Sequence, residues 1–271
     1  MLRNTKQLKG RALHARDGDL GEVKDIYFDD HHWHVRYFAV QTGAWLNKRQ
    51  VLIAPEALDP LDWDRGTFPT NLTADQVRNS PSIDTAKPVS RQHEQALRVY
   101  YGWPTYWDTP FVSGGLAAPI IAPIPAANTA EPGLTDGEAP LAKRGDPRLQ
   151  SVNDTKGYRI DAIDAVIGHV HDFLIDERGW RIRYVVVDTG KWWPGRKVLV
   201  APDWIKNISW ADRSVTVDLT RGAIKESPPY DESAPWNPAY SAELHDYYRK
   251  PRYSDWDGDV TAGAPRLGRD Q

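Results

Sequence analysis

The chain has 271 residues, 40% of them hydrophobic and 26% charged, a composition typical of a folded protein rather than a disordered one. Its formal net charge of −3 is spread evenly, so neither half has the basic excess that generic nucleic-acid binding requires. The sequence contains no cysteine, which excludes disulfides, thiolate nucleophiles, Cys-ligated zinc and iron–sulfur clusters.

No membrane segment is predicted. The N-terminal stretch has no apolar core of the kind found in a secretory signal. The most apolar run, residues 116–127, is interrupted by Pro119, Pro123 and Pro125 and is shorter than the roughly 20 apolar residues that a spanning helix needs. We therefore expect a soluble, cytoplasmic protein without a membrane anchor of its own.

The first 81 residues predict short strands and one small helix. Period-two alternation, β-branched residues and aromatic residues favour strands over residues 11–15, 22–28, 33–40, 50–54 and 66–71. The helix is expected over residues 73–80, because Thr73 and Gln76 have the spacing of a capping box and Pro81 follows.

The polar stretch at residues 28–37, "FDDHHWHVRY", raises the question of a metal site. Histidines 31, 32 and 34 lie beside Asp29 and Asp30, but no obvious ligand spacing supports metal binding. The alternative is a solvated turn between two strands.

A repeat in the sequence favours the turn. Residues 10–55 align without a gap on residues 157–202, at an offset of 147, with 19 identities in 46 positions where shared composition alone gives roughly 3. The three histidines become Arg178, Gly179 and Arg181 in the second copy, so the common element is a polar hairpin turn. The offset also predicts the same elements again, in the strands at 158–162, 169–175, 180–187, 197–201 and 214–219 and the helix at 220–227.

Regular short strands with one small helix favour a small barrel in each copy. The expected fold is therefore mainly β, with two barrels in tandem joined by a Pro/Ala-rich linker, each carrying a tail rich in Tyr and Trp. The divisions are a first barrel over residues 1–81, its tail over 82–110, a linker over 111–148, a second barrel over 149–228, its tail over 229–256 and a disordered C-terminus over 257–271. The two halves could form a pseudo-twofold pair, as a homodimer does.

Two aspartates occupy matching positions next to apolar residues, Asp25 and Asp172. One interpretation is a carboxylate that fixes a local turn or pairs with an arginine such as Arg36 or Arg183. The other is a proton-relay group. Phosphate-binding loops, nucleophile elbows and zinc-protease helices have no match in the sequence, so we expect no catalytic residues, no cofactor and no metal.

Two matching loops combine tryptophan with basic residues, the pair that most often anchors protein interfaces. We take these loops as the candidate protein-binding surface, although their indoles could equally cover a barrel end or join the two halves. The candidate residues are Trp45, Lys48 and Arg49 in the first copy and Trp192, Trp193, Arg196 and Lys197 in the second.

The repeated pattern resembles the PRC-barrel family. It runs from Gly21-x-Val23-x-Asp25 to Pro55 and from Gly168-x-Val170-x-Asp172 to Pro202, and the resemblance covers about 80 residues in each half. Similar domains are the cytoplasmic part of the photosynthetic reaction-centre H subunit and the C-terminal part of the ribosome maturation factor. The membrane helix of the former and the N-terminal domain of the latter have no counterpart in this sequence.

The resemblance implies a small β-barrel that contacts other macromolecules. It leads us to expect a non-catalytic bacterial adaptor that docks on a protein complex, with peripheral association at the inner membrane through that partner. The alternative is a ribosome- or RNA-associated assembly factor that uses Arg36, Arg183, Lys48 and Arg49. An enzyme comes third, and a deep polar pocket with convergent titratable groups would favour it.

Overall fold

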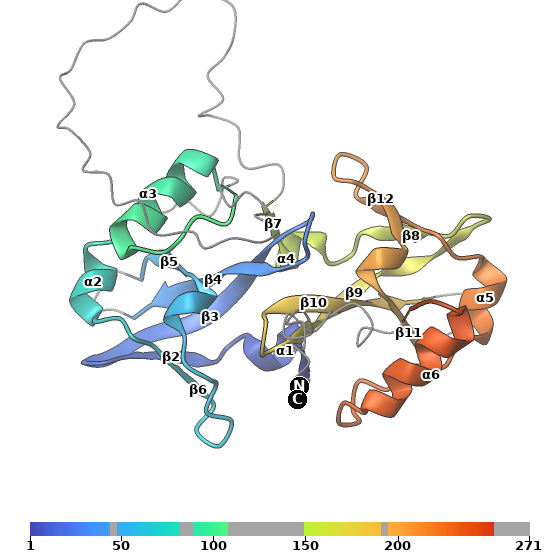
Figure 1. Cartoon of the computed structure of the whole chain (residues 1–271), viewed down its shortest axis with the longest axis horizontal. Coiled ribbons are helices and arrows are strands. Elements are labelled where there is room, and N and C mark those ends of the chain that lie inside the picture. The colour runs from blue at the N-terminus through green and yellow to red at the C-terminus, as the bar shows by residue number, and fades with distance from the viewer. Residues whose placement is uncertain (44–47, 82–88, 108–148, 191–194, 252–271) are drawn as a thin grey trace, which may run out of the picture.

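The computed structural model describes residues 1–43, 48–81, 89–107, 149–190 and 195–251, which form two β-sheets with a few helices (Figure 1). The mainly β prediction is confirmed. The first sheet has six strands in the order β5-β4-β3-β2-β6, with β7 added beside β3. The second has seven in the order β11-β10-β9-β8-β13-β12, with β1 added beside β9.

The first sheet consists of β2 (Ala12–Ala15), β3 (Gly18–Asp29), β4 (Val35–Thr42), β5 (Gln50–Ile53), β6 (Thr67–Pro69) and β7 (Leu149–Ser151). The second consists of β1 (Leu2–Asn4), β8 (Arg159–Asp161), β9 (Val166–Asp176), β10 (Arg181–Asp188), β11 (Lys197–Val200), β12 (Ile205–Ser209) and β13 (Ser214–Val217).

A long antiparallel hairpin forms the centre of each sheet, β3–β4 in the first and β9–β10 in the second. Gly21 and Gly168 permit the close approach of its two strands. Their φ angles are 147° and 154°, and a Cβ atom on either would lie 2.0 Å from the carbonyl oxygen of Gln41 or Asp188. The glycine that opens each repeat is therefore required by the backbone.

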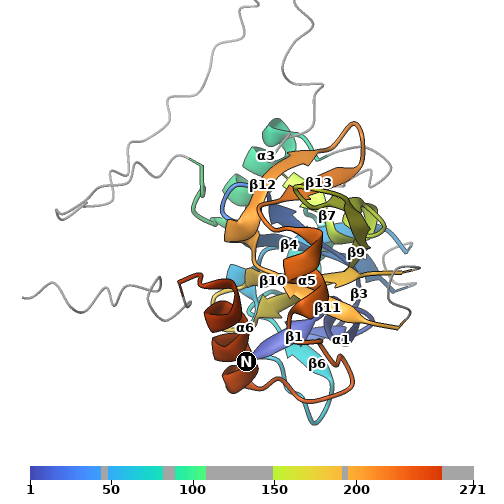
Figure 2. The same ribbon diagram turned by 90° about the vertical axis from the view of Figure 1, so that its right-hand side faces the viewer.

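The two halves exchange strands. Strand β1 from the first half pairs with β9, in the register Leu2↔Asp176, and β7 from the second half pairs with β3, in the register Leu149↔Asp29. Adding 147 to one register gives the positions of the other. Between the two exchanges, His34 and Arg181, themselves 147 residues apart, form an isolated bridge. The halves are thus related by an approximate twofold axis near this bridge (Figure 2).

One hydrophobic core extends through both halves. Phe28 and Phe173 have ring centroids 5.5 Å apart, and the Trp180 indole lies edge-on to Phe38 at 5.0 Å. A second, smaller cluster lies on the other face of the first sheet and contains Tyr37 and Leu97. Strand β4 is therefore buried on both faces, whereas its alternating pattern indicated one core-facing side.

The structure has three short helices in each half among the residues it describes, where the sequence indicated one. They are α1 (Thr5–Leu8), α2 (Ala74–Arg78), α3 (Arg91–Tyr101), α4 (Val152–Thr155), α5 (Arg221–Glu226) and α6 (Pro238–Tyr248). The capping box at Thr73 and Gln76 is confirmed in α2. Helices α3 and α6 form in the two Tyr/Trp-rich tails, and none of the described helices is long and apolar enough to cross a bilayer.

Candidate functional site

The polar stretch at residues 28–37 is a turn, stabilised by one buried carboxylate. Asp29 accepts hydrogen bonds from the backbone N–H groups of His31 at 3.2 Å and His32 at 2.7 Å, and it binds the Arg36 guanidinium at 2.7 Å. In the second half Asp176 accepts from the Arg178 N–H at 3.2 Å. No group of three or more histidine and acidic residues that could hold a metal ion occurs within the described residues.

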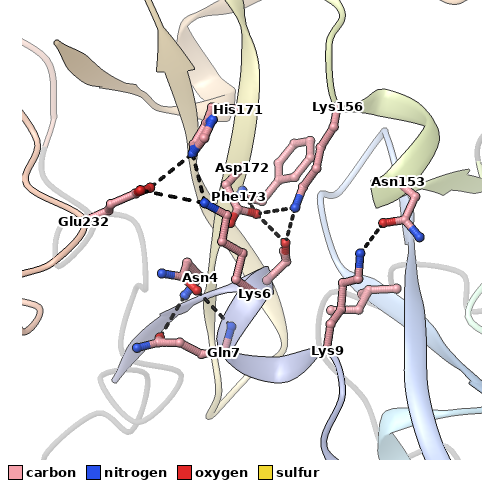
Figure 3. A network of polar contacts seen from close by, with 12 residues as sticks. Asn4, Lys6, Gln7, Lys9, Asn153, Lys156, His171, Asp172, Phe173 and Glu232 are labelled. Carbon is pink, nitrogen blue, oxygen red and sulfur yellow. Dashed lines mark hydrogen bonds and ion pairs between the residues drawn. The ribbon is translucent and has the colours of Figure 1, made fainter. Parts of the chain in front are cut away.

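Asp25 and Asp172 bind the exchanged segments rather than an arginine. Asp25 accepts from the Ser151 hydroxyl at 2.5 Å and from the Asn153 N–H at 3.2 Å. Asp172 accepts from the Thr5 hydroxyl and pairs with the Lys156 ammonium at 3.0 Å (Figure 3). Burial raises the pKa of Asp25 above its usual value.

The arginines expected beside these aspartates lie elsewhere. Arg36 pairs with Asp29, and Arg183 pairs with Asp176 at 3.3 Å. The Asp25 and Asp172 carboxylates therefore hold the two halves together at equivalent positions.

The candidate loops are described only in part, since Trp45, Trp192 and Trp193 lie outside the described residues. Of the basic candidates, Lys48 is exposed, with a φ angle of 52°. Arg49 donates to the carbonyl oxygens of Val77 at 2.6 Å and Ser80 at 3.1 Å, at the end of α2.

The second loop has the same arrangement. Arg196 donates to the Ser227 carbonyl after α5, the position equivalent to Ser80. Lys197 pairs with Glu232 at 2.5 Å, a carboxylate that also receives Lys6 from the first half at 3.7 Å (Figure 3). The two arginines thus fasten each loop to its own half, and the contact role of the tryptophans stays a prediction.

Two clefts lie between the halves, and each is formed by the hairpin turn of one half and the segment after the fourth central strand of the other. The first, called here the apolar cleft, has a volume of about 490 Å³ and is lined by Leu8, Leu58, Asp59, Pro60, Leu61, Trp63, Glu177, Arg178 and Trp180. The second, called here the polar cleft, has a volume of about 460 Å³ and is lined by Asp30, His31, Trp33, Arg181, Pro202, Asp203, Ile205, Lys206, Asn207, Ile208 and Trp210.

The clefts are equivalent under the offset of 147 residues. Trp63 corresponds to Trp210, and Trp180 to Trp33, but other matching positions differ in chemistry. Pro60 in the apolar cleft corresponds to Asn207 in the polar one.

In the apolar cleft, Trp63 is held from two sides. The Arg3 guanidinium lies 3.7 Å from its ring centroid, and the indole N–H donates to Glu177 at 3.2 Å. Leu61 and Trp180 are half-buried beside it. The cleft therefore presents two preorganised indoles and apolar side chains, which can bind an apolar group without rearranging.

In the polar cleft, Trp210 packs on Tyr158 at 5.7 Å, and the exposed side chains are ionic. Lys206 pairs with Asp218 at 2.8 Å, and Asp203 is exposed.

Sequence reasoning missed both clefts, because each needs residues from the two halves. The signal that could have found them is the repetition of two tryptophan pairs, Trp33/Trp180 and Trp63/Trp210, at the same offset.

Comparison with protein-family models assigns a family to part of the chain. The PRC-barrel domain model matches residues 151–224, which run from the end of β7 into α5. A search of curated proteins finds no match to the chain. Residues 151–224 are therefore a PRC-barrel domain, and the N-terminal half of the chain is a second β-sheet domain.

Proposed function

We propose that this chain is a tandem PRC-barrel protein that acts as a non-catalytic adaptor, docking on a protein complex at the cytoplasmic face of a membrane. The assignment of the first half to the same family is supported by its 19 identities in 46 positions with the second and by the equivalent strand registers.

The apolar cleft is the observation that carries the docking role. Buried tryptophans surrounded by water-excluding neighbours are the residues that contribute most to binding at protein interfaces. Here Trp63 and Trp180 remain partly accessible beside Leu58 and Leu61 in a preformed cleft. An enzyme site requires titratable groups that converge on a substrate, and this cleft offers mainly apolar contact.

The Trp/Arg loops are a second predicted contact. Because Arg49 and Arg196 are engaged within their own halves, we expect binding there to depend on Trp45, Trp192, Trp193 and Lys48.

The test compares two equivalent positions. Tagged wild-type chain, Leu61→Asp and Ile208→Asp are crosslinked in cells, and the partners in membrane, ribosome and soluble fractions are identified by mass spectrometry. Leu61 lies in the apolar cleft and Ile208 at the matching position of the polar cleft, and both are half-buried. We expect one dominant membrane-protein complex, recovered with wild type and Ile208→Asp and reduced about tenfold with Leu61→Asp.

Equal recovery with both variants would remove the apolar cleft from the docking surface. A parallel Trp45→Ala/Trp192→Ala double variant then decides whether the loops carry the contact. Ribosomal proteins as the dominant partners would replace the adaptor proposal with an assembly factor. Thermal unfolding of all variants ensures that a lost partner reflects the surface rather than the fold.

A further inference from the structure

We propose that the apolar cleft binds a proline-rich segment that carries a basic residue. This inference rests on the proposed docking function and names the chemistry of the partner segment.

The wall of the cleft is unsuited to adding a strand. In the second half, β12 pairs with β13 through four residue pairs, from Ile205 to Ser209. At the equivalent place in the first half only the end pairs remain, Leu58↔Thr70 and Asp62↔Thr67. Pro60 lies between them and has no N–H group to donate. A partner that needs a regular strand edge does not find one here.

A polyproline II segment needs no such edge. Its backbone has no internal hydrogen bonds, and its rings pack on grooves lined by aromatic side chains. The apolar cleft supplies this lining with Trp63 and Trp180, together with Leu58, Pro60 and Leu61. Its volume of about 490 Å³ is within the range of ligand pockets, so a short stretch of such a segment fits.

Two exposed charges at the cleft complete the match. Within the described part of the chain, neither Arg178 nor Asp59 forms an ion pair, and both are exposed. The Arg178 guanidinium can donate to the free carbonyl oxygens of a polyproline II backbone. The Asp59 carboxylate can pair with a basic side chain of the ligand. Glu177, the other carboxylate of the cleft, is already bound to Trp63 and Arg3.

The polar cleft lacks this combination. Lys206 replaces Asp59 and Asn207 replaces Pro60, so a basic ligand residue meets a like charge there. One chain should therefore bind one such segment.

The probe is the synthetic peptide acetyl-APPLPPRPA-amide, titrated into the full-length chain and followed by the indole N–H resonances of Trp63 and Trp210. We expect saturable shifts at Trp63 but not at Trp210, with a Kd on the order of 100 μM. Replacing the prolines by alanine should weaken binding about tenfold. Leu61→Asp should do the same, whereas Ile208→Asp should leave it unchanged.

A charge-reversal pair tests the basic residue. Asp59→Lys should weaken the arginine peptide about fivefold and have little effect on a version with alanine in place of arginine. Equal binding of the proline and alanine peptides, or shifts centred on Trp210, would overturn the inference, as would no shift at 2 mM of the proline peptide. If Leu61→Asp still loses its partner complex in cells, the docking proposal stands and only the chemistry of the segment is wrong.

Discussion

His34 lies near the approximate twofold axis, opposite Arg181 in an isolated strand bridge. Burial, followed by the charges of Arg36 and Arg181, lowers the pKa of His34 to about 4, against a smaller opposing effect of Asp29. A histidine that prefers its neutral form in the folded chain stabilises the fold above pH 6.5. This stability is lost as the pH falls from 6.5 towards 4, because the unfolded chain takes up the proton first.

We therefore expect the free energy of unfolding to fall by about 1–2 kcal/mol over this range, after allowing for solvent screening of a half-exposed group. His34→Gln should flatten that part of the profile. Urea titrations at several pH values measure the effect, and an unchanged slope in His34→Gln would assign it to other groups.

Asp25 and Asp172 are equivalent in sequence but differ in environment. Lys156 pairs with Asp172, whereas Asp25 receives a hydroxyl and backbone N–H groups, and burial raises its pKa. A carboxyl with a raised folded-state pKa favours folding when protonated. Its deprotonation therefore reduces stability as the pH rises from about 4 through the folded pKa.

Asp25→Asn should remove this decline and change stability at pH 7 by less than about 1 kcal/mol. Asp172→Asn should cost about 2 kcal/mol at pH 7, because it leaves the Lys156 ammonium without its partner. Chemical denaturation of the two variants side by side gives the comparison. Equal costs at pH 7 would show that the difference in environment has no energetic consequence.

At the scale of elements, the strands and the helices α2 and α5 were predictable, because alternation and capping signals are local. Helices α3 and α6 were not. The inward side of α3 contains Glu94 and Arg98, which are 0% and 1% exposed, beside Leu97. Buried charges at these positions hide the apolar period that identifies an amphipathic helix. The helix covers the second face of β4, which explains why that strand is buried on both sides.

Arg98 connects α3 to the sheet and to the segment after the helix. Its guanidinium donates to the Tyr37 hydroxyl at 2.9 Å and to the Pro104 carbonyl. Arg98→Ala should cost about 3–5 kcal/mol, because it leaves buried polar partners unsatisfied. Gln95→Ala, on the exposed side of the same helix, should change stability by less than about 0.5 kcal/mol. Thermal and urea unfolding measure both, and similar small effects would mean that α3 is held by apolar contacts alone.

At the scale of the molecule, the repeat was evident from the sequence but the strand exchange was not. The exchanged strands Leu2–Asn4 and Leu149–Ser151 have three residues each, too few for a periodic pattern. Equivalent strands can pair with their own half or with the other, and the sequence of one half contains the same pairing partner as the other. The clefts follow from the exchange, and so the site could not be located before the relation of the halves was known.

The exchange predicts that the two halves unfold together. Phe28 and Phe173 meet in the core that both halves share, and each sheet contains a strand from the other half. Phe173→Ala should therefore cost about 3–5 kcal/mol and lower the opening free energy of β4 and β10 by the same amount, measured by native-state hydrogen exchange. Leu97→Ala, in the smaller cluster that lies within the first half, serves as the comparison. If Phe173→Ala accelerated exchange in β10 while β4 kept its protection, the halves would be separate folding units, and the strand exchange would contribute little to the stability of either.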